Sequence, residues 1–218
     1  VLLDLLGRKA VVVGGGAVAA RKIETLLECG ASVHIISRDL APELQKRLDN
    51  GEINLLANEF DERHIEDAFL IIIATDDRAV NQRISETAKR KNILVNAVDQ
   101  PEECSFIVPS VIRRGDLVIA VSTSGRSPAL AKRIREILSV QFGKEYESFL
   151  KMMGRIRKEL LSMGLPESER GGIFQELVDS SIIEFLRMQD LAAAASELER
   201  ILKRHFSMDD VAEYLKGE

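Results

Sequence analysis

Apolar runs alternate with amphipathic stretches through the first half of the chain. The apolar runs are rich in Val, Ile and Leu and predict strands at residues 9–13, 33–36, 53–56, 69–74 and 93–97. The intervening stretches repeat apolar side chains every three or four positions and predict helices at residues 17–29, 40–50 and 77–91. Strands and helices that alternate in this way indicate an α/β fold with a Rossmann-like, doubly wound parallel sheet.

The pattern changes after Asp99. Two further apolar runs, at residues 104–109 and 117–122, flank the turn residues 114–116 and predict a hairpin with antiparallel pairing. Ser127 and Pro128 then have the residue types of a helix N-cap and first turn, so a helix is expected to begin there.

The last third of the chain has helical periodicity. From about Glu145 one apolar stripe contains Tyr146, Phe149, Leu150, Met153, Ile156 and Leu160. We expect a loop at 165–172, helices at 173–188 and 191–206, and a capping box before a last short helix. The sequence thus predicts a Rossmann domain at 1–109, a small connecting region at 110–145 and an all-helical C-terminal domain at 146–218.

Composition narrows the class of protein. The 218 residues are 45% hydrophobic and 30% charged, as in an ordinary globular protein, and the net charge of −5 argues against nucleic acid as a partner. No apolar run reaches the roughly 20 residues that cross a bilayer, and the first ten residues lack the pattern of a signal peptide. Two cysteines and three histidines without a CxxC pair speak against a structural zinc site. We therefore expect a cytoplasmic protein with no membrane partner.

A glycine-rich loop joins the first predicted strand to the first predicted helix. Gly14, Gly16 and Ala19 have the spacing of the dinucleotide fingerprint, which brings a pyrophosphate to the helix N-terminus. The alternative is a glycine turn without a ligand. At the end of the second strand, Arg38 suits a 2′-phosphate, whereas Asp39 stands slightly late for the acid that binds ribose hydroxyls, so the loop alone leaves NAD and NADP open.

Two other segments carry candidate chemistry. Asp99 lies just beyond the strand at 93–97, where it could accept a proton or bind a metal, although a lone Asp in this position is more often a loop cap. Residues 122–128 combine hydroxyls, a glycine and Arg126 before a helix, which suits carboxylate ligands. An ordinary capped helix with a solvated basic face explains the same residues equally well.

Five motifs occur together in one order, at residues 12–22, 74–77 with Asn81, 96–99, 104–109 and 122–128. In this combination the chain resembles precorrin-2 dehydrogenase, the sirohydrochlorin-forming module of sirohaem synthases. The resemblance is strong over residues 1–145 and loose over the helical tail. It implies oxidation of precorrin-2 to sirohydrochlorin with NAD as cofactor, and in some members insertion of Fe²⁺ in the same cleft. Because 218 residues leave no room for a methyltransferase module, substrate methylation is expected from another protein.

The resemblance also implies roles for individual residues. Asp99 would be the catalytic residue, and would contact the metal only if the protein is also a chelatase. The cofactor would contact Gly14, Gly16, Ala17, Val18, Arg38, Asp39, Thr75, Asn96 and Val98. The tetrapyrrole would contact Ser122, Thr123, Ser124, Gly125, Arg126 and Ser127. Family members are homodimers that exchange the region around 110–145, which would make this a dimerisation region.

A different class of function remains open from the sequence. A non-catalytic, dinucleotide-sensing regulatory domain would need the glycine loop but neither Asp99 nor the loop at residues 122–128. Nucleotide binding without tetrapyrrole binding would distinguish this hypothesis.

Overall fold

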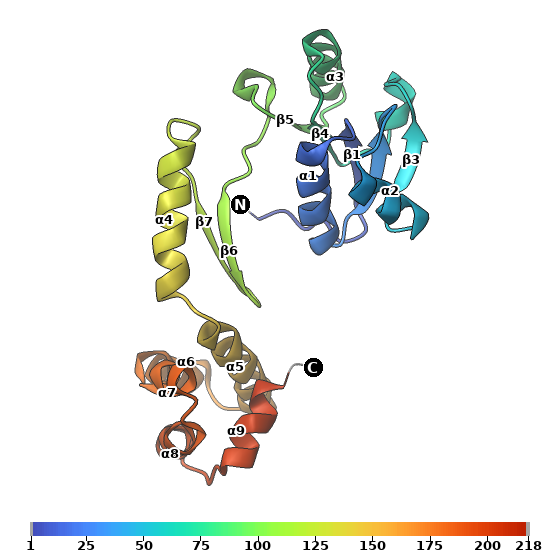
Figure 1. Cartoon of the computed structure of the whole chain (residues 1–218). Coiled ribbons are helices and arrows are strands. Elements are labelled where there is room, and N and C mark those ends of the chain that lie inside the picture. Colours follow the sequence, from blue (N-terminus) through green and yellow to red (C-terminus); the bar gives the residue numbers. More distant parts are fainter. Residues whose placement is uncertain (1, 217–218) are drawn as a thin grey trace. The chain divides into compact units, whose positions relative to one another are not determined.

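The structure is a computed structural model that describes residues 2–216. The chain forms two compact units, Val1–Val108 and Pro109–Glu218 (Figure 1). The finer division into domains at 1–109, 110–145 and 146–218 stays a prediction. Among the described residues, none of the helices combines the length and the apolar character that a bilayer span requires.

The first unit contains the predicted parallel sheet. Its strands are β1 (Lys9–Val13), β2 (Ser32–Ile36), β3 (Asn54–Ala57), β4 (Leu70–Ile73) and β5 (Leu94–Ala97). They pair in the order β3-β2-β1-β4-β5, and every pairing is parallel. The chain winds outward from β1 to β3 and then from β4 to β5, so the direction of winding reverses between β1 and β4. A ligand crevice is expected at the carboxyl ends of the strands beside this reversal.

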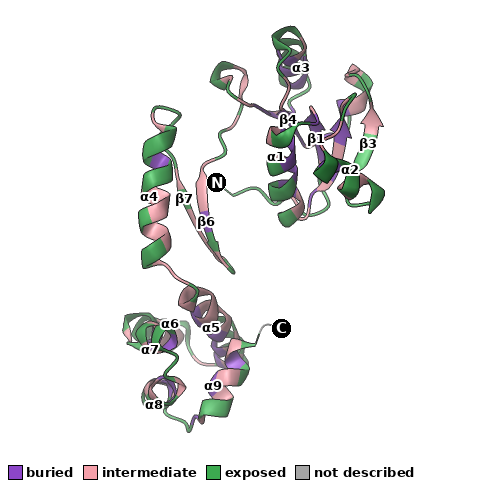
Figure 2. Ribbon diagram, viewed as in Figure 1, coloured by how far each residue is buried: buried purple, intermediate pink, exposed green. Residues whose placement is uncertain are grey.

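Both faces of this sheet are covered. Between the strands run α1 (Ala17–Glu28), α2 (Pro42–Asp49), α3 (Arg78–Arg90) and the short 3₁₀ helices η1 (Glu62–Ile65) and, after β5, η2 (Pro101–Glu103). Alternate residues of β1 and β4 enter two separate cores: Val12 and Ile72 pack with α1 and α2, whereas Val11 and Ile71 pack with α3. Burial on both faces explains why β4 is apolar at every position and β1 at every position after Lys9 (Figure 2).

The second unit begins with a hairpin and a helix. Strands β6 (Ser110–Arg114) and β7 (Leu117–Val121) pair antiparallel, and α4 (Pro128–Gln141) follows. The Ser127 hydroxyl caps α4 by accepting a hydrogen bond from Leu130 N at 3.3 Å, as the sequence predicted. At the other end of α4, the Arg114 guanidinium donates to the carbonyls of Phe142 and Ser139 at 2.9 and 3.1 Å. The hairpin is thereby fixed to the C-terminus of the helix.

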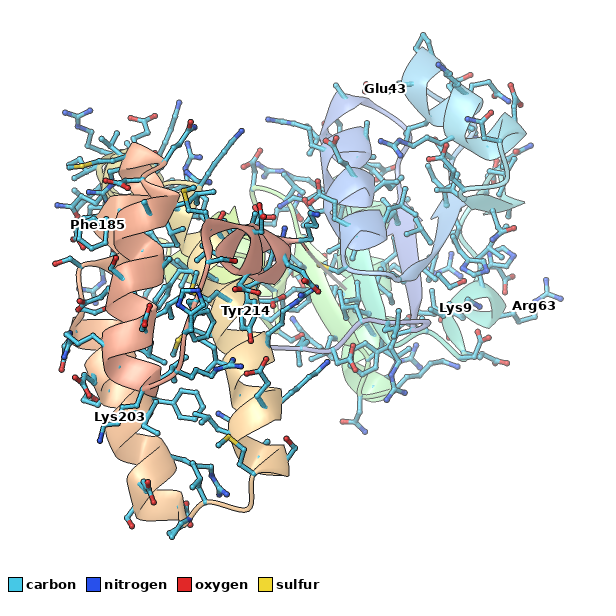
Figure 3. All side chains as sticks on the ribbon, turned by 90° about the horizontal axis from the view of Figure 1, so that it is seen from below. Lys9, Glu43, Arg63, Phe185, Lys203 and Tyr214 are labelled. Carbon is cyan, nitrogen blue, oxygen red and sulfur yellow. The ribbon has the colours of Figure 1, made fainter. Side chains whose placement is uncertain are left out.

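The rest of the second unit is helical. It consists of α5 (Glu145–Ser162), α6 (Glu167–Asp179), α7 (Ile182–Met188), α8 (Leu191–Leu202) and α9 (Met208–Leu215). Of the predicted apolar stripe of α5, Phe149, Ile156 and Leu160 enter its core, together with Met152, which is fully buried where Met153 was expected. The predicted Tyr146 and Leu150 are only partly buried and lie outside this core. The predicted capping box of Ser207 and Asp210 begins α9. On α9, Tyr214 (labelled in Figure 3) packs edge-on against the ring of Phe206, with 5.7 Å between the centroids.

The strand predicted at 104–109 is wrong, and the first hairpin strand lies at β6 instead. Segment 104–106 does run beside β5, but only Ser105 N makes a backbone hydrogen bond to it among the described residues, to Val95 O at 2.8 Å, and side chains supply the other contacts. Ser105 Oγ accepts from Val95 N at 2.8 Å, and the Asn96 amide donates to Phe106 O at 3.0 Å. Apolar alternation therefore identified a segment against the sheet edge, not a strand.

Two helix boundaries in the tail are also wrong. The predicted loop at 165–172 is largely the first part of α6, where Glu167 and Glu169 favour the positive end of the helix dipole despite the glycines that follow. The predicted helix at 173–188 breaks between α6 and α7. There the Ser180 hydroxyl donates to Leu177 O at 2.7 Å and competes with the backbone hydrogen bonds of a continuous helix.

The helical core provides a test of the corrected register on α5. Met152→Ala is expected to lower the unfolding free energy of the second unit by about 2–5 kcal/mol, because a fully buried side chain leaves a cavity. Met153→Ala, the matched control on a half-buried neighbour, should cost clearly less. Urea denaturation followed by far-ultraviolet circular dichroism measures both variants. Equal losses would contradict the register.

Candidate functional site

A cleft of about 530 Å³ opens at the carboxyl edge of the parallel sheet. Its walls are the segments that follow four neighbouring strands, residues 13–16, 36–38, 58–60 and 74–77, together with Val80 and Arg83 of α3. Of the residues predicted to bind cofactor, Gly14, Gly16, Arg38 and Thr75 line it. This is the crevice expected from the reversal between β1 and β4.

The first two glycines of the loop are required by the packing of the protein itself. A Cβ on Gly14 would lie 2.2 Å from the carbonyl oxygen of Ala74, and the φ of +114° there also disfavours any other residue. A Cβ on Gly15 would lie 2.1 Å from the carbonyl oxygen of Asp39. Both contacts are with backbone atoms of the adjacent strand ends, so neither glycine can be replaced without moving the sheet edge.

Gly16 differs from both neighbours because a Cβ there would meet no atom within 4 Å. It is exposed, serves as the N-cap of α1 and has an ordinary φ of −85°. No side chain caps α1, so the first N–H groups of the helix, including those of Ala17 and Val18, face open space. Open space before uncapped donors at a helix N-terminus fits an anionic ligand such as a pyrophosphate.

An ion pair stands at the rim of the cleft beyond β2. The Arg38 guanidinium lies 2.5 Å from a carboxylate oxygen of Glu59, which follows β3. Asp39 is exposed and is not among the lining residues, and its carbonyl accepts a hydrogen bond from Ser37 Oγ at 2.7 Å. Of the two residues predicted after β2, the structure places only Arg38 in the cleft.

Thr75 is held rigidly on the opposite wall. Its hydroxyl donates to Asn81 Oδ1 at 2.6 Å, and the Asn81 amide donates back to the Thr75 carbonyl at 3.0 Å. Asn81 is 1% exposed on α3, and both its oxygen and its nitrogen have a partner in this pair of bonds. Asn81 therefore fixes the turn after β4 and does not contact the cleft directly.

Asp99 lies at the same edge of the sheet, just after β5. Its backbone is left-handed, with φ of +59°, and its side chain is exposed. Within residues 2–216 no hydrogen bond or ion pair engages the carboxylate, so Asp99 does not act as a loop cap in this structure. An exposed carboxylate at the carboxyl edge is available to a ligand.

Lys22 of α1 is the charged group associated with Asp99. Burial lowers the pKa of the half-buried Lys22 ammonium, and Arg21 lowers it further, while Cys104 and Asp99 act in the opposite direction. The electrostatic coupling places Lys22 near the loop after β5. Lys22 closes the motif at residues 12–22, but the sequence alone indicates no role for it, because its coupling to Asp99 joins two different elements.

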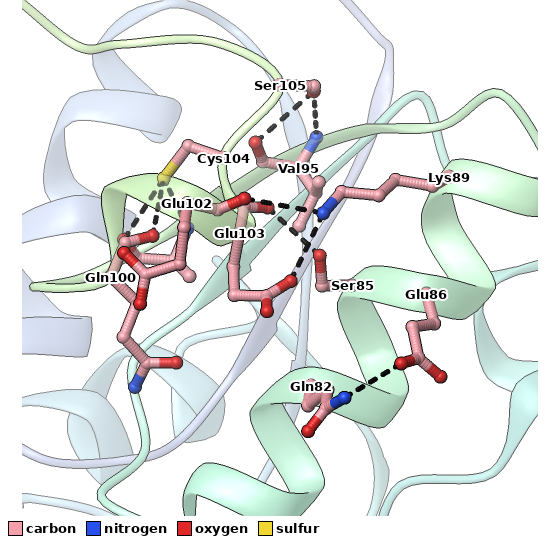
Figure 4. A network of polar contacts seen from close by, with 11 residues as sticks. Gln82, Ser85, Glu86, Lys89, Val95, Gln100, Glu102, Glu103, Cys104 and Ser105 are labelled. Atoms are coloured by element: carbon pink, nitrogen blue, oxygen red, sulfur yellow. Dashed lines mark hydrogen bonds and ion pairs between the residues drawn. The ribbon is translucent and has the colours of Figure 1, made fainter.

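A network around the Cys104 thiol braces the loop that carries Asp99 (Figure 4). Cys104 Sγ accepts a hydrogen bond from Ala97 N at 3.2 Å and has the carbonyl oxygens of Ala97 and Gln100 at 3.2 and 3.4 Å. Of the predicted cofactor residues, Asn96 is buried in this network and Val98 donates its N–H to Ile73 O at 2.9 Å. Both side chains lie outside the cleft lining.

The loop predicted to bind substrate belongs to the second unit and is organised by its own hydroxyls. Ser122 Oγ accepts from Ser124 N at 3.1 Å, and Thr123 Oγ1 accepts from Ser127 N at 3.0 Å. Ser124 and Gly125 have positive φ, and Arg126 is exposed between Gly125 and the cap of α4. A hydroxyl that accepts a hydrogen bond can still donate its own hydrogen, so the loop presents donors on a fixed backbone.

The segment after β3 is the part of the cleft that sequence reasoning missed. Asn58, Glu59 and Phe60 line it, and Arg83 lies over the Phe60 ring with 5.7 Å to the centroid. The strand predicted at 53–56 would have indicated the first three by the carboxyl-end rule. No local signal identified Arg83. Among residues 2–216 no group of three or more His, Cys, Asp or Glu side chains is arranged to hold a metal ion.

Two family profiles match the chain. Residues 1–110 match the family described as putative NAD(P)-binding, and residues 114–141 match the central segment of sirohaem biosynthesis proteins. Together they cover the cleft, the loop carrying Asp99, the hairpin and α4.

Curated relatives and one solved structure extend the match. The siroheme synthase of Nitrosospira multiformis is 37% identical over 100% of this chain and 46% of its own length. Siroheme synthase 1 of Serratia proteamaculans is 38% identical over 82% of this chain and 39% of its own length. The chain thus spans less than half the length of these relatives. A structure described as SirC, precorrin-2 dehydrogenase, is 29% identical with a TM-score of 0.77, covering 93% of this chain and 98% of that chain.

These matches confirm the resemblance drawn from the motifs and the fold class. The profile over residues 1–110 includes the glycine loop, the cleft and Asp99, and the second profile follows it directly. The chain belongs to the putative NAD(P)-binding family and carries the central segment of sirohaem biosynthesis proteins.

Proposed function

We propose that this chain oxidises precorrin-2 to sirohydrochlorin with NAD⁺ as the hydride acceptor. The observation that carries the proposal is the similarity to SirC, precorrin-2 dehydrogenase, which extends over 93% of this chain and 98% of that one. A likeness over nearly the whole of both chains covers the cleft, the Asp99 edge and the second unit together. The relatives named siroheme synthase support the same substrate class.

The cleft fits the dinucleotide. The space before Gly16 admits a phosphate group, and the first N–H groups of α1 are uncapped donors for it. Gly14, Gly16, Ala17 and Val18 would hold the pyrophosphate, and Arg38 would lie toward the adenosine ribose. We keep Thr75 as a wall residue. Asp39, Asn96 and Val98 stay predictions from the resemblance, and their side chains lie outside the cleft lining.

Asp99 is the proposed catalytic residue. The oxidation removes two hydrogens from the substrate and leaves a new double bond. One hydrogen leaves a carbon as a hydride, and the other leaves a nitrogen or a second carbon as a proton. NAD⁺, when bound, supplies the hydride acceptor. The exposed, unengaged Asp99 carboxylate would take the proton, and the braced loop around Cys104 holds it at the sheet edge.

The loop at residues 122–127 is the proposed tetrapyrrole contact. The side-chain hydroxyls of Ser122, Thr123, Ser124 and Ser127, the exposed Arg126 and the backbone N–H of Gly125 would offer donors to the carboxylates of the substrate. Metal insertion stays a prediction: Fe²⁺ would be a second substrate, bound by the macrocycle nitrogens with help from Asp99. The cytoplasmic location also stays a prediction, which rests on the sequence alone.

We also propose that the protein is a homodimer joined through β6, β7 and α4. Of residues 110–141, only Ile112 and Ala131 are buried, although the segment is rich in apolar side chains. Leu130, Ile137 and Val140 of α4 are exposed, and Figure 2 shows that much of this helix is exposed. A two-stranded sheet with one helix buries too little apolar surface to be stable alone. We therefore expect a second copy of the chain to bury the exposed apolar side chains of this segment.

The experiment that tests the function is an anaerobic assay with precorrin-2 generated in place and either NAD⁺ or NADP⁺, followed by absorbance with and without Fe²⁺. Sirohydrochlorin formation with NAD⁺ is the expected result. Faster metallation than in the protein-free blank would add chelatase activity. Nucleotide binding without any oxidation would instead favour a dinucleotide-sensing domain.

Asp99→Asn should lower kcat for the oxidation by about 100-fold or more, because the proton acceptor is lost. Asn tolerates the left-handed backbone at this position, so the loop should keep its shape. The Kd for NAD⁺ should stay unchanged. Asp49→Asn, at the exposed end of α2, is the matched control and should retain full activity. Normal turnover by the Asp99 variant would remove this residue from the mechanism.

Gly16→Val should weaken NAD⁺ binding by about tenfold or more, because the new side chain fills the space proposed for the phosphate. The phosphate would then lose hydrogen bonds to the N–H groups of α1, and the loss of one such charge-assisted bond is enough for this effect. Its thermal midpoint should hardly change, since φ of −85° is ordinary for Val. Gly15→Ala should instead lower the thermal midpoint through its backbone clash. Calorimetric titration and thermal unfolding separate the two effects. Unimpaired binding by Gly16→Val would exclude this loop as the phosphate site.

Ile137→Asp combined with Val140→Asp should convert the proposed dimer to a monomer, because charges cannot be buried unpaired in an apolar interface. Sedimentation velocity measures the change. Lys132→Asp, an exposed charge change on the same helix, is the control. A wild-type protein that sediments as a monomer at all concentrations would refute the dimer.

A further inference from the structure

Arg38 and Glu59 reach the rim of the cleft from two different strand ends. Arg38 follows β2 and Glu59 follows β3, and their side chains meet at 2.5 Å. The side chains are 73% and 71% exposed, so the pair contributes little to the stability of the fold. Its effect is on the charge that a ligand meets at the end of β2.

The end of β2 is where dinucleotide folds distinguish the two nicotinamide cofactors. An acid there binds the ribose hydroxyls of NAD, whereas an arginine accepts the 2′-phosphate of NADP. In this chain Arg38 has the position for the second role. The acid that follows it in sequence, Asp39, is not in the cleft lining, so it does not fulfil the first role.

The other charged groups of the cleft do not neutralise the negative charge of Glu59 at the end of β2. Its lining contains two cations, Arg38 and Arg83, and three carboxylates, Glu59, Asp76 and Asp77. Arg83 lies over the Phe60 ring, and Asp77 accepts hydrogen bonds from Ala79 N and Val80 N as the cap of α3. Arg38 is therefore the cation closest to the end of β2, and Glu59 already occupies its guanidinium.

We propose that Glu59 makes this cleft prefer NAD over NADP. It does so by holding Arg38 in an ion pair. It also supplies, from the segment after β3, the cleft carboxylate that the segment after β2 does not provide. The inference rests on the proposed nucleotide-binding function and adds its specificity. A 2′-phosphate on Arg38 would have to displace the Glu59 carboxylate and then remain beside it, which like-charge repulsion opposes. A ribose hydroxyl carries no charge and can donate to the same carboxylate.

The test compares binding of NAD⁺ and NADP⁺, which differ only in the 2′-phosphate, by calorimetric titration of the full chain. Glu59→Gln should tighten NADP⁺ binding by about tenfold and leave NAD⁺ binding the same or slightly weaker, since Arg38 is released and the repulsion is removed. The gain should shrink at high salt, because the groups are exposed. Adding Arg38→Gln should abolish it.

Glu62→Gln is the matched control. Glu62 is three residues farther along, pairs with Arg90 at 3.2 Å and does not line the cleft, so this variant should keep the wild-type preference. An unchanged ratio of the two affinities in Glu59→Gln would overturn the inference, as would a gain that survives Arg38→Gln. Failure of the wild-type chain to bind either nucleotide would instead refute the proposed function itself.

Discussion

The turn after β1 has no room for a side chain on either flank, and much of the first unit depends on that constraint. The carbonyl of Ala74 closes one flank at Gly14, and the carbonyl of Asp39 closes the other at Gly15. The same turn is joined to the β2 side, where Gly14 N donates to Ile36 O at 2.9 Å and Ala41 N donates to Gly15 O at 2.8 Å. On the β4 side, Ala74 N donates to Val13 O at 2.8 Å. Close approach of three strand ends thus fixes where α1 begins and how wide the cleft opens.

Helix α1 then links the two chemical regions of the sheet edge. Its first residues face the cleft on the β2 side, whereas Lys22, near its middle, is coupled to Asp99 after β5. A helix packed by Ala19, Ala20 and Ile23 against the sheet cannot shift at one end without moving the other. The proposed phosphate contacts at its N-terminus and the surroundings of Asp99, the proposed catalytic carboxylate, are therefore set by one rigid element.

The sequence predicted the sheet and the glycine loop because both obey local rules. Parallel strands that are buried on both faces are mostly apolar, and a turn without space for Cβ must be glycine. It failed where side chains replace backbone partners: Ser105 takes a ladder position beside β5, and Ser180 interrupts a helix that periodicity alone would continue. Glu59 and Lys22 were missed for another reason. Glu59 acts on Arg38, which lies 21 residues away in sequence, and Lys22 is coupled to Asp99 on a different element. A short motif does not show such contacts.

An acidic chain that binds anionic ligands must rely on donors within reach and not on its overall field. The net charge is −5, and the cleft lining itself has more carboxylates than cations. The groups that face the proposed phosphate site are backbone N–H groups of α1. The donors in the loop at 122–127 are largely hydroxyl groups on a fixed backbone. Such donors act only at hydrogen-bond distance. Selectivity for a ligand then follows from where its oxygens lie, so a single carboxylate such as Glu59 can decide between two cofactors that are otherwise identical.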